Sequence, residues 1–204
     1  MNIVKEHLPD FCFSGDELYS LDAIVIHFFS GKYAFTSQKF DLQKCWELFV
    51  DLNLPIDQRR NFKLKSNPNR MYASARWLIG RMGQIWELCE EGYQQYHAGR
   101  SEWISKDHKN LDGLNKYSDG IELIGDDHTE YEYLQYKSLA WLIKNQYPQM
   151  HLKIGYDQNI GLYRPLYGST ITGHEFISPG RKSDPGRRFN WYLLDGMLNS
   201  VDFA

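Results

Sequence analysis

The sequence predicts an α/β or α+β fold in which helices flank a central mixed β-sheet. Short apolar stretches of strand length are interspersed with amphipathic stretches of helix length along the chain, and this arrangement is typical of such folds. The 204 residues are enough for one sizeable core but too few for two ordinary domains with a linker. We therefore expect residues 1–204 to form a single domain, with residues 1–20 as an irregular lead-in.

The predicted strands are short and rich in apolar residues. Residues 22–29 form the run DAIVIHFF, which we expect to be buried on both faces of the sheet. Residues 74–88 predict a hairpin with its turn at 81–83. Residues 119–125 and 169–174 predict two further short strands.

The predicted helices each carry apolar residues on one face. They cover residues 41–52, 130–147 and 189–199, whereas residues 53–72 and 92–117 have little regular pattern and are expected to be irregular. The clearest apolar stripe belongs to the second helix and consists of Tyr136, Leu139, Ala140, Ile143 and Tyr147.

The overall composition argues against several classes of protein. A net charge of −3 gives no general reason to expect a nucleic-acid partner. Cys12, Cys45 and Cys89 include no C-x-x-C pair, so we expect buried free thiols rather than disulfides or a thiolate zinc site. The N-terminus has no apolar run suited to a signal peptide, and no 18 consecutive apolar residues occur. The expected location is therefore the cytoplasm, with no membrane span.

Two residues on predicted strands could carry chemistry. His27 lies near the carboxyl end of the first apolar strand, where ligands of sheet proteins gather, although a lone histidine there is more often a core residue. Glu122 lies between Ile121 and Leu123 in a strand that should be mostly buried. A buried carboxylate is costly without a partner, so Glu122 is either paired structurally or kept for acid/base work.

The segment from residue 171 to 191 is the most informative one. His174 and Asp184 are separated by a loop rich in proline and glycine, and imidazole and carboxylate are common zinc ligands. Lys182 would place a positive charge beside them. The alternative interpretation is a basic surface loop for phosphate or nucleic acid, because four cations crowd it: Arg181, Lys182, Arg187 and Arg188.

Six segments in order resemble the zinc-dependent N-acetylmuramoyl-L-alanine amidases, a family that includes the peptidoglycan-recognition proteins. The segments are IVIH, SARWLIGRMGQIWEL, YHAGRSEW, YSDGIELIG, LQYKSLAWLIKNQYP and TGHEFISPGRKSDPGRRFNW, from about residue 22 to about residue 195. Within the family they look most like the cytoplasmic amidases that act on 1,6-anhydromuropeptides in cell-wall recycling. The resemblance implies the fold of that family.

The resemblance also implies roles for particular residues. The family's zinc ligands fall on His27, His174 and Asp184, its catalytic glutamate on Glu122 and its lysine near the metal on Lys182. It implies one zinc ion per chain. It further places Tyr96 and His97 beside the substrate groove.

Four positions depart from the family pattern. Arg76 stands where a histidine is frequent, Asp119 where an isoleucine is common, Tyr96 where tryptophan is usual, and Arg187 where proline is frequent. None of these differences removes a ligand, so they affect the details of substrate choice rather than the chemistry.

The function implied is hydrolysis of the amide bond between the lactyl group of N-acetylmuramic acid, in its ordinary or 1,6-anhydro form, and L-alanine. The expected partners are peptidoglycan fragments or peptidoglycan, and not nucleic acid. One alternative is an endolysin-type or delivered amidase that attacks the intact wall and is released by a holin or a secretion machine. An alternative of another class is a peptidoglycan-binding protein without turnover, against which the complete ligand set argues.

Overall fold

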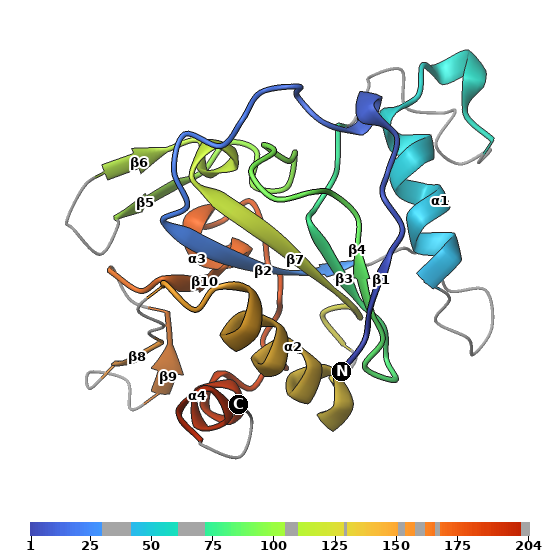
Figure 1. Cartoon of the computed structure of the whole chain (residues 1–204). Helices are drawn as coiled ribbons and strands as arrows, with labels where there is room; N and C mark the ends of the chain where they lie inside the picture. The colour runs from blue at the N-terminus through green and yellow to red at the C-terminus, as the bar shows by residue number, and fades with distance from the viewer. Residues whose placement is uncertain are drawn as a thin grey trace.

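The computed structural model describes residues 1–29, 42–60, 72–104, 110–128, 130–150, 154–157, 162–165 and 168–200. A mixed sheet of six strands runs through the middle of this part of the chain, in the order β1–β4–β3–β7–β2–β10 (Figure 1). All neighbouring strands are parallel except β3 and β4. The strands are β1 (Ile3–Lys5), β2 (Ala23–Phe29), β3 (Trp77–Ile79), β4 (Ile85–Glu87), β7 (Ser118–Ile124) and β10 (Ile171–Gly173).

Helices pack on both faces of this sheet, as the sequence predicts. Figure 1 shows α2 and α4 side by side on one face, with α1 and α3 placed elsewhere around the sheet. The mixed sheet flanked by helices confirms the predicted fold class. The helices are α1 (Leu42–Asn53), α2 (Tyr133–Gln146), α3 (His174–Ile177) and α4 (Trp191–Asn199).

The two central strands, β2 and β7, are buried along nearly their whole length. Every residue of β7 is buried, and in β2 only Phe28 is partly exposed. Alternate residues of each strand point to opposite faces, so each strand contributes side chains to the packing on both faces of the sheet. Toward α2 and α4, Ile24 and Ile26 of β2 meet Ile121 and Leu123 of β7 in the main apolar core.

The other face of the sheet is covered in two separate places. Near the carboxyl ends of the strands, Phe29 and Ile124 pack with Leu48 and Phe49 of α1. Toward the amino ends, Ala23 and Val25 pack with Ala98, Trp103, Leu111 and Leu114 and with Ile177 at the end of α3. Between these two clusters lie His27 of β2 and Glu122 of β7.

Several predicted elements are confirmed, and some short ones differ. The hairpin of β3 and β4 forms as expected, with a backbone hydrogen bond from Gly83 to Gly80 closing its turn. The lead-in, expected to be irregular, contributes β1, which pairs with β4 at the sheet edge. The region 92–117 contains a small hairpin of β5 (Glu102–Ile104) and β6 (Asn110–Asp112), and β8 (Gly155–Asp157) pairs with β9 (Leu162–Arg164). The part of the expected 53–72 loop that covers residues 61–71 lies outside the described residues.

The three cysteines agree with the prediction from composition. Cys12, Cys45 and Cys89 are buried and are not joined in disulfides. Burial raises the pKa of the Cys12 and Cys89 thiols to about 12, so both stay protonated at neutral pH. None of the helices in the described ranges is long and apolar enough to span a bilayer.

Candidate active site

Three parallel neighbours, β7, β2 and β10, bring Glu122, His27 and His174 into one row. In the β2–β7 pairing His27 lies opposite Glu122, and in the β10–β2 pairing Gly173 lies opposite Ile26. His174, the next residue, therefore comes level with His27 at the start of α3. The site is thus at the carboxyl ends of the central strands, where sheet proteins commonly bind ligands.

The loop after α3 returns Asp184 to the same place. The backbone N–H of Glu175 donates to the carbonyl oxygen of Asp184 at 2.8 Å, which ties the two ends of the loop together. Gly173 makes this approach possible, because a Cβ atom there would lie 2.6 Å from Cδ of Pro185.

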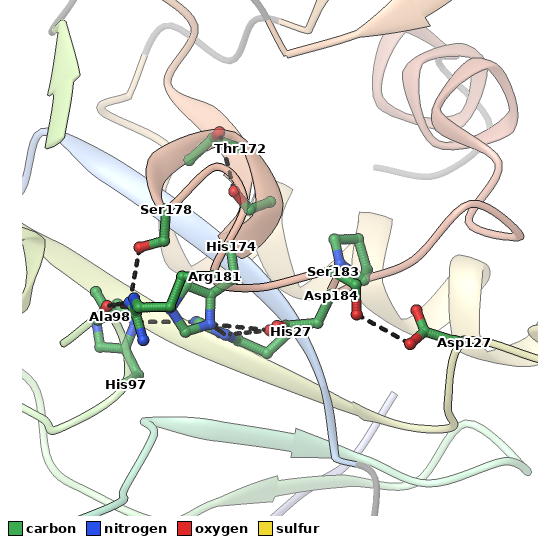
Figure 2. A network of polar contacts seen from close by, with 12 residues as sticks. His27, His97, Ala98, Asp127, Thr172, His174, Ser178, Arg181, Ser183 and Asp184 are labelled. Atoms are coloured by element: carbon green, nitrogen blue, oxygen red, sulfur yellow. Dashed lines mark hydrogen bonds and ion pairs between the residues drawn. The ribbon is translucent and has the colours of Figure 1, made fainter. Parts of the chain in front are cut away.

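His27, His174 and Asp184 converge on one point (Figure 2). His27 Nδ1 lies 2.8 Å from Asp184 Oδ2 and 3.0 Å from His174 Nδ1, and His174 Nδ1 lies 3.0 Å from the same Oδ2. All three side chains are buried. Two imidazole nitrogens and a carboxylate oxygen form a donor set that zinc prefers, so these residues fit a zinc site with an open position.

The protonation of His27 and Asp184 also fits a metal site. Burial lowers the pKa of His27 to about 4, so its ring is neutral at physiological pH, as a ligand must be. Burial alone would raise the pKa of Asp184, but its close contacts with the rings of His174 and His27, whose Nδ1 atoms lie within 3.0 Å of Oδ2, hold it below its ordinary range. The aspartate is therefore ionised and acceptor-only.

Glu122 differs from these three residues in its environment. Burial, and then the negative charge of Asp184, raises the pKa of Glu122 to about 8, and the cation of Lys182 opposes this rise. Its Oε2 is one of two buried side-chain atoms in the described ranges that have no hydrogen-bond partner; the other is Nε of Arg76. A carboxyl group with a free oxygen and a pKa near neutrality is suited to general acid/base catalysis.

A cavity of about 520 Å³ opens above these groups. Its lining includes all seven residues that the sequence singles out: His27, Tyr96, His97, Glu122, His174, Lys182 and Asp184. The apolar part of the lining comes from β2 and α1, through Phe28, Phe29, Leu48, Phe49 and Leu52. A cavity with both polar and apolar lining suits an amphipathic ligand such as a sugar joined to a peptide.

Tyr96 and His97 lie in this lining in different ways. Tyr96 is half-buried, and its ring lies 5.2 Å from that of Tyr72. His97 is buried, and both of its ring nitrogens have protein partners, His27 and Ser118. The prediction that Tyr96 and His97 contact substrate remains a prediction.

Two of the four cations in the 181–188 loop, Arg181 and Arg188, contact other parts of the protein. Arg181 Nη2 donates to the carbonyl oxygens of Ala98 and Arg100 and to Ser178 Oγ, at 2.7–2.9 Å (Figure 2). Arg188 pairs with Glu130 at 2.9 Å. Arg181 therefore links this loop to Ala98 and Arg100, beside His174. This role of Arg181 has no sequence signal, since two of its partners are backbone carbonyls about 80 residues away along the chain.

Comparison with known proteins agrees with this geometry. The family model described as N-acetylmuramoyl-L-alanine amidase matches residues 19–187, and the chain belongs to this family. A curated relative from Enterobacter cloacae, the 1,6-anhydro-N-acetylmuramyl-L-alanine amidase AmpD, is 33% identical over 127 residues. That match covers 62% of this chain and 58% of the relative's length. The AmpD of Escherichia coli K12 is likewise 33% identical, over 118 residues that make up 58% of this chain and 54% of its own length.

Solved structures share the fold. The crystal structure of an AmpD derivative superposes with a TM-score of 0.68 at 24% identity, covering 96% of this chain and 94% of that one. The E. coli amidase AmiD, solved with the substrate anhydro-N-acetylmuramic acid-L-Ala-D-γ-Glu-L-Lys, superposes with a TM-score of 0.57 at 21% identity. That likeness covers 90% of this chain and 60% of AmiD.

Proposed function

We propose that the protein is a zinc-dependent N-acetylmuramoyl-L-alanine amidase that acts on soluble 1,6-anhydromuropeptides in the cytosol, as part of cell-wall recycling. The observation that carries the proposal is the convergence of His27, His174 and Asp184 beside a buried Glu122 that has an unbonded oxygen. Family membership and the names of the AmpD relatives support the choice of bond and of sugar.

The proposed reaction splits the amide bond between the lactyl carbonyl carbon and the alanine nitrogen. His27, His174 and Asp184 would hold one zinc ion, which when bound supplies Lewis acidity toward water and the carbonyl oxygen. Glu122 takes a proton from the attacking water and delivers it to the alanine nitrogen as the C–N bond breaks. Its raised pKa suits both halves of this transfer.

Lys182 and the cavity walls have supporting roles in the proposal. Lys182 is exposed in the lining of the cavity, and its charge acts on both Glu122 and His27. A cation there stabilises the negative oxygen that develops on the lactyl carbonyl. Tyr96 and the apolar wall of α1 would hold the sugar and the peptide on either side of the amide bond.

The test is hydrolysis of a purified anhydromuropeptide, followed by mass spectrometry, with zinc-loaded and chelator-treated protein in parallel. The proposal predicts zinc-dependent release of a peptide that begins with L-alanine. The same samples are then given whole sacculi. Release from sacculi but not from the soluble fragment would replace the recycling role with an enzyme of the intact wall. Binding of both without release would leave a recognition protein.

A further inference from the structure

His97 connects the proposed metal site to strand β7. Its Nδ1 lies 3.0 Å from Nε2 of His27, on the side of that ring away from Asp184. Its Nε2 lies 3.1 Å from the carbonyl oxygen of Ser118 and 3.3 Å from Ser118 Oγ. Figure 2 shows His97 and His27 joined in this way within the polar network.

Only one tautomer of the neutral His97 ring satisfies these contacts. A carbonyl oxygen can only accept, so the Ser118 carbonyl requires a donor. The Ser118 hydroxyl gives its own hydrogen to the carbonyl oxygen of Leu114 at 2.6 Å, so its oxygen is also an acceptor toward His97. The hydrogen of neutral His97 therefore sits on Nε2, and Nδ1 of His97 accepts.

This assignment in turn determines which ring nitrogen of His27 carries the hydrogen. Because Nδ1 of His97 accepts, Nε2 of His27 carries a hydrogen and donates it. The lone pair of His27 is then on Nδ1, which faces Asp184 and His174. Nδ1 and the ionised Oδ2 of Asp184, 2.8 Å apart, are then both acceptors, as two ligands of one cation are. A neutral imidazole binds a metal through its unprotonated nitrogen, so His97 leaves His27 in the one tautomer that can act as a ligand here.

The surroundings of His97 hold its ring in this position. Oδ1 of Asn115 accepts from the backbone N–H groups of His97 and Ala98, at 3.1 and 2.7 Å. The ring lies directly against Gly120 of β7, where an added Cβ would be 2.7 Å from Cγ of His97. Only glycine at that strand position leaves the space that the ring occupies.

His174 is oriented by a different kind of partner. Its Nε2 lies 3.0 Å from the carbonyl oxygen of Ala98, a backbone group. The orientation of His27 thus depends on a side chain, and a substitution can remove it.

We propose that His97 is a positioning residue that fixes the tautomer and ring orientation of His27 for zinc binding through Nδ1. This inference rests on the proposed metal site. It gives His97 a role inside the protein in place of a contact with substrate.

The test compares zinc affinity in three variants by competition with a chromogenic chelator, starting from metal-free protein. His97→Phe keeps a ring but removes the acceptor, and it should bind zinc about 10–100-fold more weakly. His97→Asn restores an oxygen near the place of Nδ1 and should recover most of the affinity. Gln95→Leu is the matched control, because buried Gln95 bonds to Asp119 and Gly120 but to no proposed ligand. It should bind zinc as the parent does.

The outcomes separate this inference from the proposed function. A parent protein that does not bind zinc contradicts the metal site itself. A parent that binds, with His97→Phe binding equally tightly, overturns the role of His97 alone. If His97→Phe does not fold, ¹⁵N NMR of the zinc-loaded parent decides. Hydrogen on Nε2 of both His97 and His27 is expected, and hydrogen on Nδ1 of His97 would overturn the inference.

Discussion

The two faces of the central sheet are made by the same strands but serve different purposes. On the face toward α2 and α4, Ile26 and Ile121 are packed in a continuous apolar core. One residue along each strand, on the opposite face, His27 and Glu122 lie side by side in a cavity. The alternation of a β-strand therefore separates the residues that stabilise the fold from those that carry the chemistry.

The comparison of the two faces also shows that the residues of the site contribute less to stability than their neighbours do. Neighbouring strand residues are equally buried, yet burial stabilises Ile121 and disfavours the charged form of Glu122. The helix-covered face has a polar cluster of its own, in which the carboxylate of Asp119 accepts hydrogen bonds from Arg76, Tyr147 and Gln95. The carboxyl group of Glu122 instead keeps an unbonded oxygen. A buried carboxyl oxygen without a partner, in a cavity beside three candidate ligands, is the mark of a functional site.

The largest expected effect is loss of zinc from the cavity face. Asp184→Ala removes one of three proposed ligands. Losing a residue that only hydrogen-bonds a ligand weakens metal binding by ~10–100-fold, so loss of the ligand itself should weaken zinc binding by more than that. The thermal midpoint of the metal-free protein should change little by comparison. Zinc content after dialysis, measured by atomic emission, checks this, and full occupancy in the variant would remove Asp184 from the ligand set.

The second effect concerns the polar cluster on the helix-covered face. Arg76 Nη1 donates to Asp119 Oδ2 at 2.7 Å, and both residues depart from the family pattern. Asp119→Ile alone removes the nearest partner of a buried cation, leaving Glu91 and Glu87 at 3.6 and 3.8 Å, and should cost about 3–5 kcal/mol of unfolding free energy. Combining it with Arg76→His should cost less than the sum of the two single changes. Urea unfolding of all three variants measures this, and strictly additive losses would mean that the pair is not coupled.

The third effect isolates the apolar core. Leu139 of α2 is fully buried, so Leu139→Ala should cost about 2–5 kcal/mol of unfolding free energy through lost burial and a cavity. Zinc affinity should stay at the parent value, because the residue lies on the other face of the sheet. Parallel denaturant and chelator titrations check the separation. A large fall in zinc affinity would show that the two faces are not independent.

The smallest effect is a pH dependence of stability in the metal-free protein. The pKa of Glu122 is about 8 in the fold and near 4.5 when unfolded, so the folded state holds a proton that the unfolded state has lost. The stability that Glu122 contributes is present below pH 4.5 and is lost as the pH rises through 8. Glu122→Gln should remove this decline in stability with pH. Each kcal/mol of unfolding free energy corresponds to a change of about 2–4 °C in the thermal midpoint. Parallel pH profiles of thermal midpoints in parent and variant would argue against the raised pKa.

Much of the fold follows from periodicity, and the exceptions have physical reasons. The apolar run of β2 and the stripe of α2 are long enough to carry a pattern, and both form as predicted. Strands β1, β5, β6, β8 and β9 have three residues each, too few for any period to be visible. The equally short β3 and β4 are predictable because they flank a turn that the sequence indicates at residues 81–83. Whether residues 1–204 form one domain stays a prediction.

The residues of the candidate site could be predicted from the sequence to different degrees. The sequence marks His27, Glu122, His174 and Asp184 as reactive groups in an apolar or loop context, and the resemblance to the amidase family implies their roles. The structure brings the four residues together. The contact between His97 and His27 could not be foreseen, since it depends on the space left by Gly120 on another strand. Tertiary contacts of this kind carry no local signal.

The most direct test is a paired measurement on the parent and Glu122→Gln, with zinc content and peptide release determined on the same samples. We expect one zinc ion per chain in both proteins. Release of the L-alanyl peptide from an anhydromuropeptide should fall about 10²–10⁴-fold in the variant. Release at the parent rate by zinc-loaded Glu122→Gln would contradict the role of Glu122 as the acid/base. A parent that holds no zinc and still releases the peptide would contradict the metal site.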